Sequence, residues 1–508
     1  MSADAAPATV PDLTVAAGSA LVPPRRSWQY GIAPHYIGMF LWVGFSDRLA
    51  RSTLAVGGLG LSMIGFVIGG LLCNVLLFQG PALWGKGADK TTFELAPRVF
   101  GKRGARWAGA IMGLAQIVWF AVGVAVAAEW TLDGLVALGF LDEKIHAPTT
   151  VGSLVLPNKL FLVTSLFWCF AVGLTATWLV RVIGAIMNAY PIFPALALAA
   201  VVAVMLGGLP RFAPTGIDPW IGRAVSTEQG ALLAITRAIA LVMGFFATAG
   251  VLSADWGKGS ETERDVVIGG WVGVSLASIV IASLGLMACA GYQGRVAPAT
   301  LEAPEPGVIR ASGSTILDLS PPSPPELTLH AAIASGIGGR LGGGILLILG
   351  LGSLAPAVYA SFQYAHRFKE AIGGISRIAW MLVATAAAWP LIALGATRDL
   401  ERIFLIMGAV FAPMAATYSA IARHDRREWT GARTGINPAA AIGWFVGLFV
   451  GLIPFLPIEG ASRFQPAVLW SFVAAWATTR ALASLGLETP AENPEPSASE
   501  SRDHEPRS

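Results

Sequence analysis

Charged side chains are scarce in this sequence. Asp, Glu, Lys and Arg supply 13% of the 508 residues, whereas hydrophobic residues supply 55% and the mean hydropathy is +0.64. A soluble domain carries roughly 25% charged residues. The composition therefore excludes an ordinary soluble domain. It predicts an all-α integral membrane protein, because a bilayer core about 30 Å thick needs about 20 apolar residues per helix and the chain supplies such runs repeatedly.

Cysteine and catalytic motifs are lacking as well. The three cysteines, Cys73, Cys169 and Cys289, lie inside apolar runs without metal-ligand spacing, so we expect buried thiols and no metal site. No metalloprotease-type His-Glu motif or nucleophile elbow lies within a helix, and there is no Gly-Lys-Ser/Thr phosphate motif. These absences argue against an enzyme, a resident cofactor and ATP-driven transport, and nothing indicates a nucleic-acid partner.

Apolar runs between short polar breaks predict about twelve transmembrane helices. The 59 Gly suit close packing of membrane helices, and the 17 Trp suit membrane interfaces. The predicted helices span residues 31–57, 59–84, 107–139, 160–180, 182–209, 231–254, 266–292, 336–365, 375–396, 401–422, 436–458 and 465–486.

The placement of Lys and Arg predicts the orientation. If the N-terminus is inside, the inner side receives Arg25, Arg26, the basic stretch 86–106 and the stretch 423–433, while the outer loops hold fewer basic residues. Cytoplasmic loops carry the excess of Lys and Arg. We therefore expect an even helix number, both termini in the cytoplasm and a multi-pass protein of the inner membrane.

Three segments outside the helices have distinct compositions. Residues 1–28 are polar and Ala/Pro-rich, without the apolar core of a signal peptide, and predict a cytoplasmic tail before a transporter domain at 29–487. Residues 488–508 are rich in Pro, Glu and Ser and predict a disordered cytoplasmic tail. The loop 293–335 is long and acidic, which favours a partly flexible connection, with a lid as the alternative.

Polar residues interrupt the first predicted helix at Ser46-Asp47-Arg48, with Arg51 close behind. One interpretation is a helix broken near mid-membrane, whose freed carbonyls and Asp47 line a polar cavity. The other is a helix that ends near Gly44, so that Asp47 and Arg51 pair at the outer surface.

Helices 3 and 6 carry candidate binding residues. Gln116 and Trp119 are three residues apart and share one helix face, where an indole can stack on a flat ring and an amide can bond its edge. Packing of Trp119 and an interhelical bond of Gln116 are the alternative. The run from Gly244 to Gly250 suits a break or a close helix approach, and Asp255 suits a helix end.

Helix 8 opens with a glycine cluster at 336–344 and continues as Leu351-Gly352-Ser353-Leu354-Ala355-Pro356. Close helix packing explains the glycines most simply.

At these residues the chain resembles the purine/cytosine permease family of nucleobase–cation symporters. The resemblance covers about residues 30–460 and is densest at 91–104, at 113–124 and at 244–255, with 412–438 following as well. It implies a leucine-transporter-type fold, with helices 1–5 and 6–10 as inverted repeats, two extra C-terminal helices, and breaks in helices 1 and 6. It also implies H⁺- or Na⁺-driven import of a planar nitrogen heterocycle.

By position, the resemblance assigns Trp119 to stack the substrate and Gln116 to bond its edge. Phe246 would cover the other face, and Thr248 with Ala249 would line the pocket. Cytosine-type members carry an Asn and paired Thr residues on helix 8, where this chain offers only Ser353.

This departure puts the sodium site and cytosine as the substrate in question. We therefore expect Ser46, Asp47 and Ser353 to include any ion-coupling group, with Asp47 as a carboxylate ligand or a proton carrier.

Two other functions stay open. The first is an amino-acid or amine carrier on the same fold, whose binding would not depend on Trp119. The second is a membrane sensor or scaffold that kept the fold but does not transport. The expected partners are a small heterocycle and the lipid bilayer, and we expect a monomer or a loose oligomer.

Overall fold

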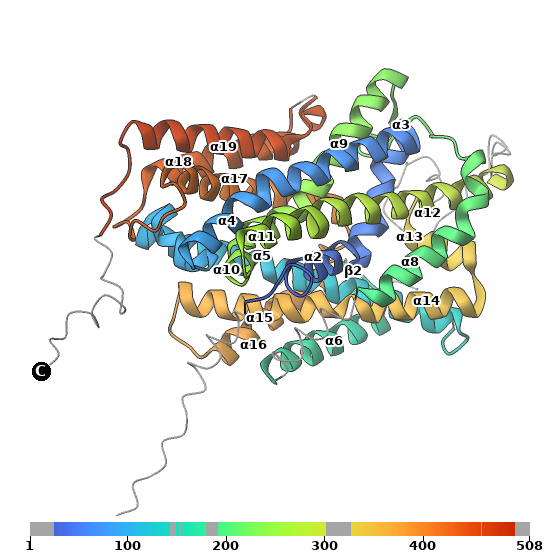
Figure 1. Ribbon diagram of the computed structural model, residues 1–508. Helices are drawn as coiled ribbons and strands as arrows, with labels where there is room; N and C mark the ends of the chain where they lie inside the picture. Colours follow the sequence, from blue (N-terminus) through green and yellow to red (C-terminus); the bar gives the residue numbers. More distant parts are fainter. Residues whose placement is uncertain are drawn as a thin grey trace, which may run out of the picture.

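The computed structural model in Figure 1 describes residues 25–142, 149–151, 154–178, 191–300, 327–458 and 460–492. Helices dominate, and the two short antiparallel hairpins lie in connections: β1 (Thr149–Val151) with β2 (Leu154–Leu156), and β3 (Ile217–Asp218) with β4 (Arg223–Ala224). Within these residues, eight helices are long and apolar enough to cross a membrane, and two further apolar helices are shorter. The all-α membrane architecture is confirmed, and the number twelve stays a prediction.

The first membrane helix is interrupted in its middle. α2 (Ile32–Phe40) and α3 (Val43–Leu72) are separated by Leu41 and Trp42, and Trp42 has extended backbone angles. α3 bends sharply at Gly58, whose φ of +75° suits glycine. The π-helical turn η1 (Cys73–Phe78) and α4 (Gln79–Ala88) continue this segment.

The longest helix, α5 (Thr92–Ala137), begins at a capping box in which Thr91 and Glu94 bond each other's backbone N–H groups. α14 (Gly339–Gly352) and α15 (Leu354–Ala371) run antiparallel along it, so that Gly134 faces Gly343 and Gly113 faces Phe368. A Cβ on Gly343 would lie 2.9 Å from the Gly134 carbonyl oxygen. Close packing is therefore the role of this glycine in the helix 8 cluster.

A second interrupted segment consists of α9 (Thr227–Val251) and α10 (Ser253–Lys258), which meet at Leu252. After it come α11 (Glu263–Gly270), the π-turn η4 (Trp271–Leu276) and α12 (Ala277–Thr300). The remaining helices are α6 (Lys159–Trp178), α8 (Ile192–Met205), η3 (Leu206–Arg211), α13 (Leu329–Ala331), η5 (Ala332–Ile337), α16 (Arg377–Ala393), α17 (Leu400–His424), α18 (Pro438–Leu452), η6 (Ile453–Phe455), η7 (Ala461–Arg463) and α19 (Ala467–Ser484).

The helices pack as two groups. In the α3 group, α3 packs against α9 and α12, and α4 packs against α10. In the α5 group, α5 packs against α14 and α15, and α16 packs against α6 and α15. Contact between α3 and α5 themselves is sparse. α17, α18 and α19 pack together, and α17 also covers α9. Any cavity at the seam between the first two groups is therefore lined from both sides.

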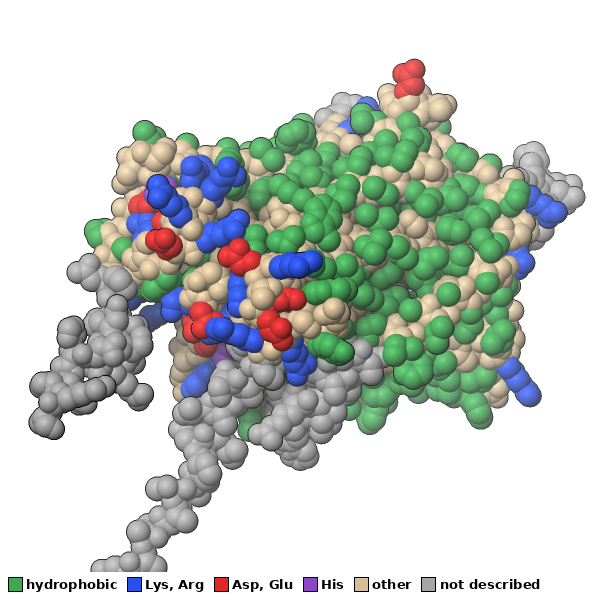
Figure 2. Space-filling view, in the orientation of Figure 1, with side chains coloured by type: hydrophobic (Ala, Val, Ile, Leu, Met, Phe, Trp, Pro, Cys, Tyr) green, Lys and Arg blue, Asp and Glu red, His purple; other side chains and the backbone are tan. Residues whose placement is uncertain are grey.

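The surface separates into an apolar band and a charged end. In Figure 2, hydrophobic side chains cover the middle of the molecule, and most Lys, Arg, Asp and Glu gather at the left, near α10 and α15. Large hydrophobic side chains on the surface include Leu114, Phe167 and Phe449, which are 58–65% exposed. Contiguous apolar surface of this kind suits contact with lipid tails.

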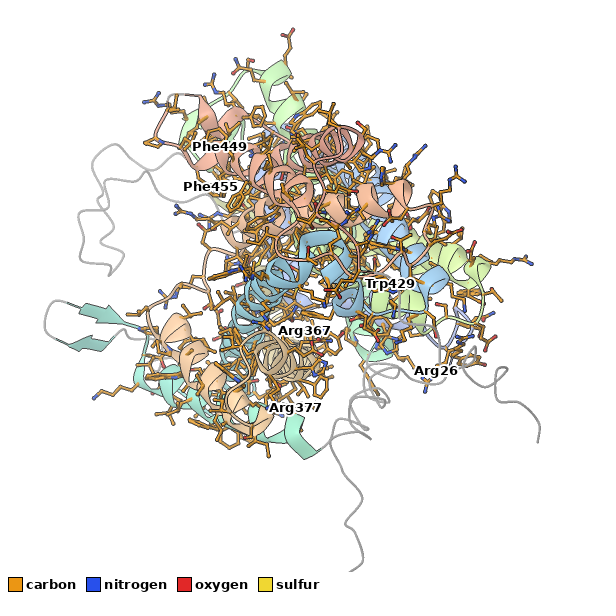
Figure 3. The ribbon with its side chains drawn as sticks, turned by 90° about the vertical axis from the view of Figure 1, so that its left-hand side faces the viewer. Arg26, Arg367, Arg377, Trp429, Phe449 and Phe455 are labelled. Atoms are coloured by element: carbon orange, nitrogen blue, oxygen red, sulfur yellow. The ribbon has the colours of Figure 1, made fainter. Side chains whose placement is uncertain are left out.

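Both ends of the described chain lie at the charged end. The Arg26 N–H donates to the Gly259 carbonyl at 2.9 Å, and Lys102 pairs with Glu492 at 2.5 Å. Figure 3 looks onto this end, with Arg367 near its centre. The two ends of the described chain therefore lie on the same side of the apolar band.

The predicted C-terminal tail begins later than expected. The C-terminal tail was expected to be disordered from residue 488, but Arg433 donates to the Glu488 carboxylate and the Thr489 carbonyl, and the Glu492 N–H bonds Ala432 at 2.8 Å. The buried arginine needs these acceptors, so the packed domain extends to at least residue 492. The remainder of that tail, residues 1–24 and the central loop residues 301–326 lie outside the described part.

Candidate substrate site

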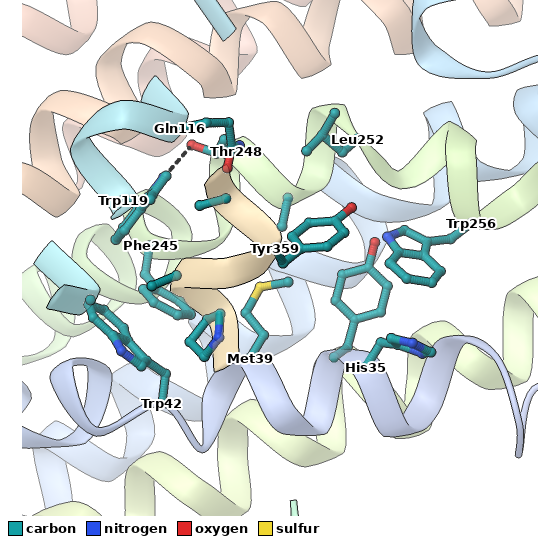
Figure 4. Close-up of a pocket in the computed structure, with 16 residues that line it drawn as sticks. His35, Met39, Trp42, Gln116, Trp119, Phe245, Thr248, Leu252, Trp256 and Tyr359 are labelled. Atoms are coloured by element: carbon teal, nitrogen blue, oxygen red, sulfur yellow. Dashed lines mark hydrogen bonds between the residues drawn. The ribbon is translucent and has the colours of Figure 1, made fainter. Parts of the chain in front are cut away.

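A cavity of about 120 Å³ lies at the seam between the α3 and α5 groups (Figure 4). Both interrupted segments reach it, because Trp42 belongs to the break between α2 and α3, and Leu252 is the break between α9 and α10. α5 and α15 supply the opposite side. The lining residues are His35, Tyr36, Met39, Trp42, Gln116, Trp119, Gly123, Phe245, Thr248, Ala249, Leu252, Trp256, Pro356, Ala357, Tyr359 and Ala360.

Aromatic rings form one end of the cavity. Trp42 stacks on Phe245 with ring centroids 5.9 Å apart and planes 12° apart. Trp119 meets Phe245 edge-on at 5.6 Å and Trp42 edge-on at 5.9 Å. Edge-to-face and offset arrangements of this kind are favourable and fix the ring planes. The three rings make a rigid apolar corner suited to a flat molecule.

Polar atoms are few and uncharged. The Trp119 Nε1–H donates to the Thr248 hydroxyl at 3.2 Å, which joins α5 to α9 across the site. Gln116 is buried, and its amide has no hydrogen-bond partner among the described residues. Tyr359 accepts a bond from Gln363 at 2.7 Å. No Asp, Glu, Lys or Arg is among the described residues that line the cavity.

Four of the five predicted substrate residues lie together at this cavity: Gln116, Trp119, Thr248 and Ala249. Phe246 does not line it. Its fully buried ring stacks on Phe40 at 5.8 Å and 9°, behind the cavity wall. Phe245 takes the lining position instead, because Thr248, Ala249 and Leu252 follow it by three, four and seven residues and so share its helix face.

Sequence reasoning missed the contribution of helix 1. His35, Met39 and Trp42 follow a helical spacing of four and three residues onto the cavity. This spacing was available in the sequence. Trp256, Pro356 and Tyr359 carry no local signal that separates them from packing residues.

The break in helix 1 lies before the polar residues that predicted it. It falls at Leu41–Trp42, and Ser46, Asp47 and Arg48 lie inside the regular helix α3. Neither sequence interpretation placed it there, because no glycine or proline marks the two residues. Packing of Trp42 decides the position: its ring folds over Gly44, where a Cβ would lie 2.5 Å from the ring.

The glycines of helix 6 serve close packing rather than the break. α9 is regular through Gly244 and Gly250, and the interruption falls at Leu252. A Cβ on Gly244 would lie 2.3 Å from the Phe404 carbonyl oxygen of α17, and one on Gly250 would lie 2.8 Å from Leu77. Asp255, expected at a helix end, lies in α10, where it accepts the Thr92 N–H at 2.6 Å and Arg367 at 3.1 Å.

The three candidate ion-coupling residues each have different neighbours in the fold. Ser46 faces Gly285 of α12, and its hydroxyl has no hydrogen-bond partner in the described chain. Asp47 pairs with Arg48 at 3.0 Å and accepts the His330 N–H at 2.8 Å. Ser353 separates α14 from α15, bonds the Gly350 carbonyl at 2.6 Å and faces Gly123 of α5.

This chain is similar to known proteins in its structure but not detectably in its sequence. No protein-family model and no curated protein sequence matches this chain. MHP1, a nucleobase-cation-symport-1 family transporter in a closed conformation with bromovinylhydantoin bound, aligns over 95% of this chain and 98% of its own, with a TM-score of 0.58 and 15% identity. Its inward-facing conformation aligns over 94% and 96%, with a TM-score of 0.57 and 14% identity.

A Na⁺-coupled sialic acid symporter in a substrate-bound, outward-open state aligns over 92% of each chain, with a TM-score of 0.51 and 10% identity. The chain has the leucine-transporter-type fold. The expected fold class is thereby confirmed. Within this leucine-transporter-type fold, the two interrupted segments are α2–α3 and α9–α10, and the cavity lies where they meet α5 and α15.

Proposed function

We propose that this protein is a secondary active transporter that imports a neutral, planar nitrogen heterocycle, driven by H⁺ or Na⁺. The observation that carries the proposal is the cavity: it lies at two helix breaks, is walled by aromatic rings, and offers an amide and hydroxyls but no charged side chain. MHP1, which shares the fold, was solved with a substituted hydantoin bound, a ring of this chemical class.

The residues suit such a ligand in two ways. The corner of Trp42, Trp119 and Phe245 can stack a flat ring. The Gln116 amide presents both a donor and an acceptor, which matches the adjacent N–H and C=O groups of nucleobase and hydantoin edges.

The uncharged lining argues against an amino acid or amine as substrate. Each carries at least one full charge at neutral pH, and burying an unpaired charge is very costly. A neutral heterocycle needs only stacking and a few hydrogen bonds. The retained cavity and both helix breaks also favour a transporter over a sensor without transport.

We further propose that the charged end faces the cytoplasm and that the protein resides in the cytoplasmic membrane as a multi-pass protein. Described basic residues at this end include Arg25, Lys86, Lys102, Arg423 and Arg433, and cytoplasmic loops carry the excess of Lys and Arg. A monomer or loose oligomer is the assembly we expect.

The test is a thermal-shift screen of the purified protein against nucleobases, hydantoins and amino acids, followed by uptake in proteoliposomes. A heterocycle should raise the melting temperature of the wild type, and Trp119→Ala should abolish this shift because it removes a stacking wall. Trp107→Ala is the matched control, since Trp107 is also on α5 but is 69% exposed on the apolar surface.

Stabilisation by an amino acid that persists in Trp119→Ala would instead support the amino-acid carrier. A wild type that neither binds nor takes up any compound of these classes would refute the transport proposal.

A further inference from the structure

One residue joins the two helix groups at the end opposite the charged one. His330 lies in α13, just before η5 and α14. Its backbone N–H donates to Asp47 Oδ1 of α3 at 2.8 Å, and its Nε2 is 2.7 Å from Asp133 Oδ2 of α5. Because α3 and α5 otherwise touch sparsely, this residue is a bridge between them.

The bridge is partly enclosed, since the His330 side chain is 25% exposed and the Asp133 side chain is 13% exposed. Asp47 is only 4% exposed, and the Trp130 ring packs edge-on against His330 at 5.5 Å. Glu129 is four residues before Asp133, hence on the same face of α5, and it is exposed although Ala128 and Trp130 beside it are buried.

The charges around His330 are unbalanced. α3 contributes Asp47 and Arg48, which pair at 3.0 Å, α5 contributes Glu129 and Asp133, and α12 contributes the buried thiol of Cys289. Among the described residues around a neutral His330, there are three carboxylates and one arginine. A proton on the imidazole reduces this excess of negative charge and converts the contact with Asp133 into an ion pair.

We propose that His330, held between Asp47 and Asp133, is the proton-binding site through which H⁺ entry closes the end of the cavity opposite the charged end. The proposal rests on the proposed transport function and assigns H⁺ as its coupling ion. With the proton bound, Nε2–H donates to Asp133 and the backbone N–H holds Asp47, so that α3 and α5 are locked together. Without it, the ion pair is lost and the carboxylates repel one another.

The pKa of His330 is consistent with this role. Burial lowers it, but the hydrogen bond to Asp133 and the charges of Asp133, Asp47 and Glu129 raise it by more, so that it lies above the ordinary value. The imidazole therefore holds its proton more firmly than a free histidine does, and it releases the proton where the pH rises above this raised pKa.

The other end has its own bridge, which lacks a histidine. Asp255 of α10 accepts bonds from the Thr92 N–H at 2.6 Å and from Arg367 of α15 at 3.1 Å. Arg367 also lies over the Phe93 ring at 3.7 Å. Arginine stays protonated at all accessible pH values. The bond between Arg367 and Asp255 is therefore not itself switched by a proton, unlike the contact between His330 and Asp133.

The experiment compares wild type, His330→Gln and the control His424→Gln in proteoliposomes. Glutamine keeps an N–H donor for Asp133 but cannot titrate in this range. An inward gradient of about one pH unit can drive roughly tenfold accumulation at one proton per substrate. We expect His330→Gln to lose this accumulation while keeping exchange of labelled for unlabelled substrate, and His424→Gln, at the charged end, to keep both.

Retained proton-driven accumulation in His330→Gln, or wild-type accumulation driven by Na⁺ and indifferent to pH, would overturn the inference while leaving transport intact. Absence of any exchange in the wild type would instead refute the proposed function.

Thermal unfolding provides a readout that needs no substrate. A raised pKa means that the charged imidazole stabilises the fold fully below about pH 6.5, the ordinary value, and that this stabilisation disappears as the pH rises through the raised pKa. The melting temperature of wild type relative to His330→Gln should therefore fall between mildly acidic and alkaline pH. A difference that is constant or grows with pH would contradict the bridge. Asp133→Asn, which keeps the acceptor but removes the charge, should flatten the profile in the same way.

Discussion

At the scale of single residues, Gly44 controls the shape of the cavity. The Trp42 ring folds over it, and a Cβ at this position would lie 2.5 Å from the ring. We predict that Gly44→Ala displaces Trp42 from Phe245 and weakens heterocycle binding by at least about tenfold, or about 1.4 kcal/mol. Calorimetric titration of the purified variant measures this directly.

Gly60→Ala is the matched control on the same helix. A Cβ at Gly60 meets nothing within 4 Å, so binding should be unchanged, and replacing a helical glycine should stabilise α3 by roughly 0.5–1 kcal/mol. Equal effects of the two substitutions on binding would show that Trp42 is not positioned by Gly44.

The residues at the cavity were predictable to different degrees. Gln116 and Trp119 could be paired from their spacing on one helix, and Thr248 with Ala249 followed from the family resemblance. The resemblance points to Phe246, but Phe245 lines the cavity. The helical spacing from Phe245 to Thr248, Ala249 and Leu252 favours Phe245. His330 could not be linked to Asp47 or Asp133 at all, since 283 and 197 residues separate them and only the fold brings them together.

At the scale of elements, the resemblance correctly named helices 1 and 6 as interrupted, but the residues at which they break were not predicted. Apolar runs locate membrane helices because the bilayer requires their length. A break is different, since its cost is offset by contacts with other helices, such as Trp42 on Phe245. Polar residues at 46–48 and glycines at 244 and 250 were plausible markers, but they lie within regular helices.

A buried ion pair links α5 to the C-terminal end of α17, and its contribution to stability can be measured. Arg98 donates twice to Asp425, at 2.7 Å each, and both side chains are at most 6% exposed. Arg98→Met should lower the free energy of unfolding by about 3–5 kcal/mol, because it leaves a buried carboxylate unpaired. Chemical denaturation in detergent measures the loss, and adding Asp425→Leu should restore much of it.

Arg25 and Asp89 provide the comparison. They pair at 3.2 Å with both side chains more than half exposed, so Arg25→Met should cost less than about 1 kcal/mol. A similar loss in both arginine variants would mean that burial of the Arg98 pair does not matter.

At the scale of the whole molecule, orientation can be read by thiol labelling. Cys73, Cys169 and Cys289 are all buried, which keeps the background low. Arg423 and Arg223 are exposed, with Arg423 at the end of α17 and Arg223 in β4. We predict that a membrane-impermeant maleimide labels Arg223→Cys in intact cells, and Arg423→Cys only in inverted vesicles. The opposite pattern would invert the proposed topology.

The hydrogen bond from Trp119 to Thr248 bears on the step of a transport cycle that follows substrate release. It connects the α5 and α3 groups across the cavity, and both partners line the cavity. A transporter that has released its substrate must return to its starting conformation without it. Buried polar groups left without hydrogen-bond partners would hinder that step. Here the Trp119 N–H and the Thr248 hydroxyl satisfy each other, so this pair needs no new partner once the substrate has left.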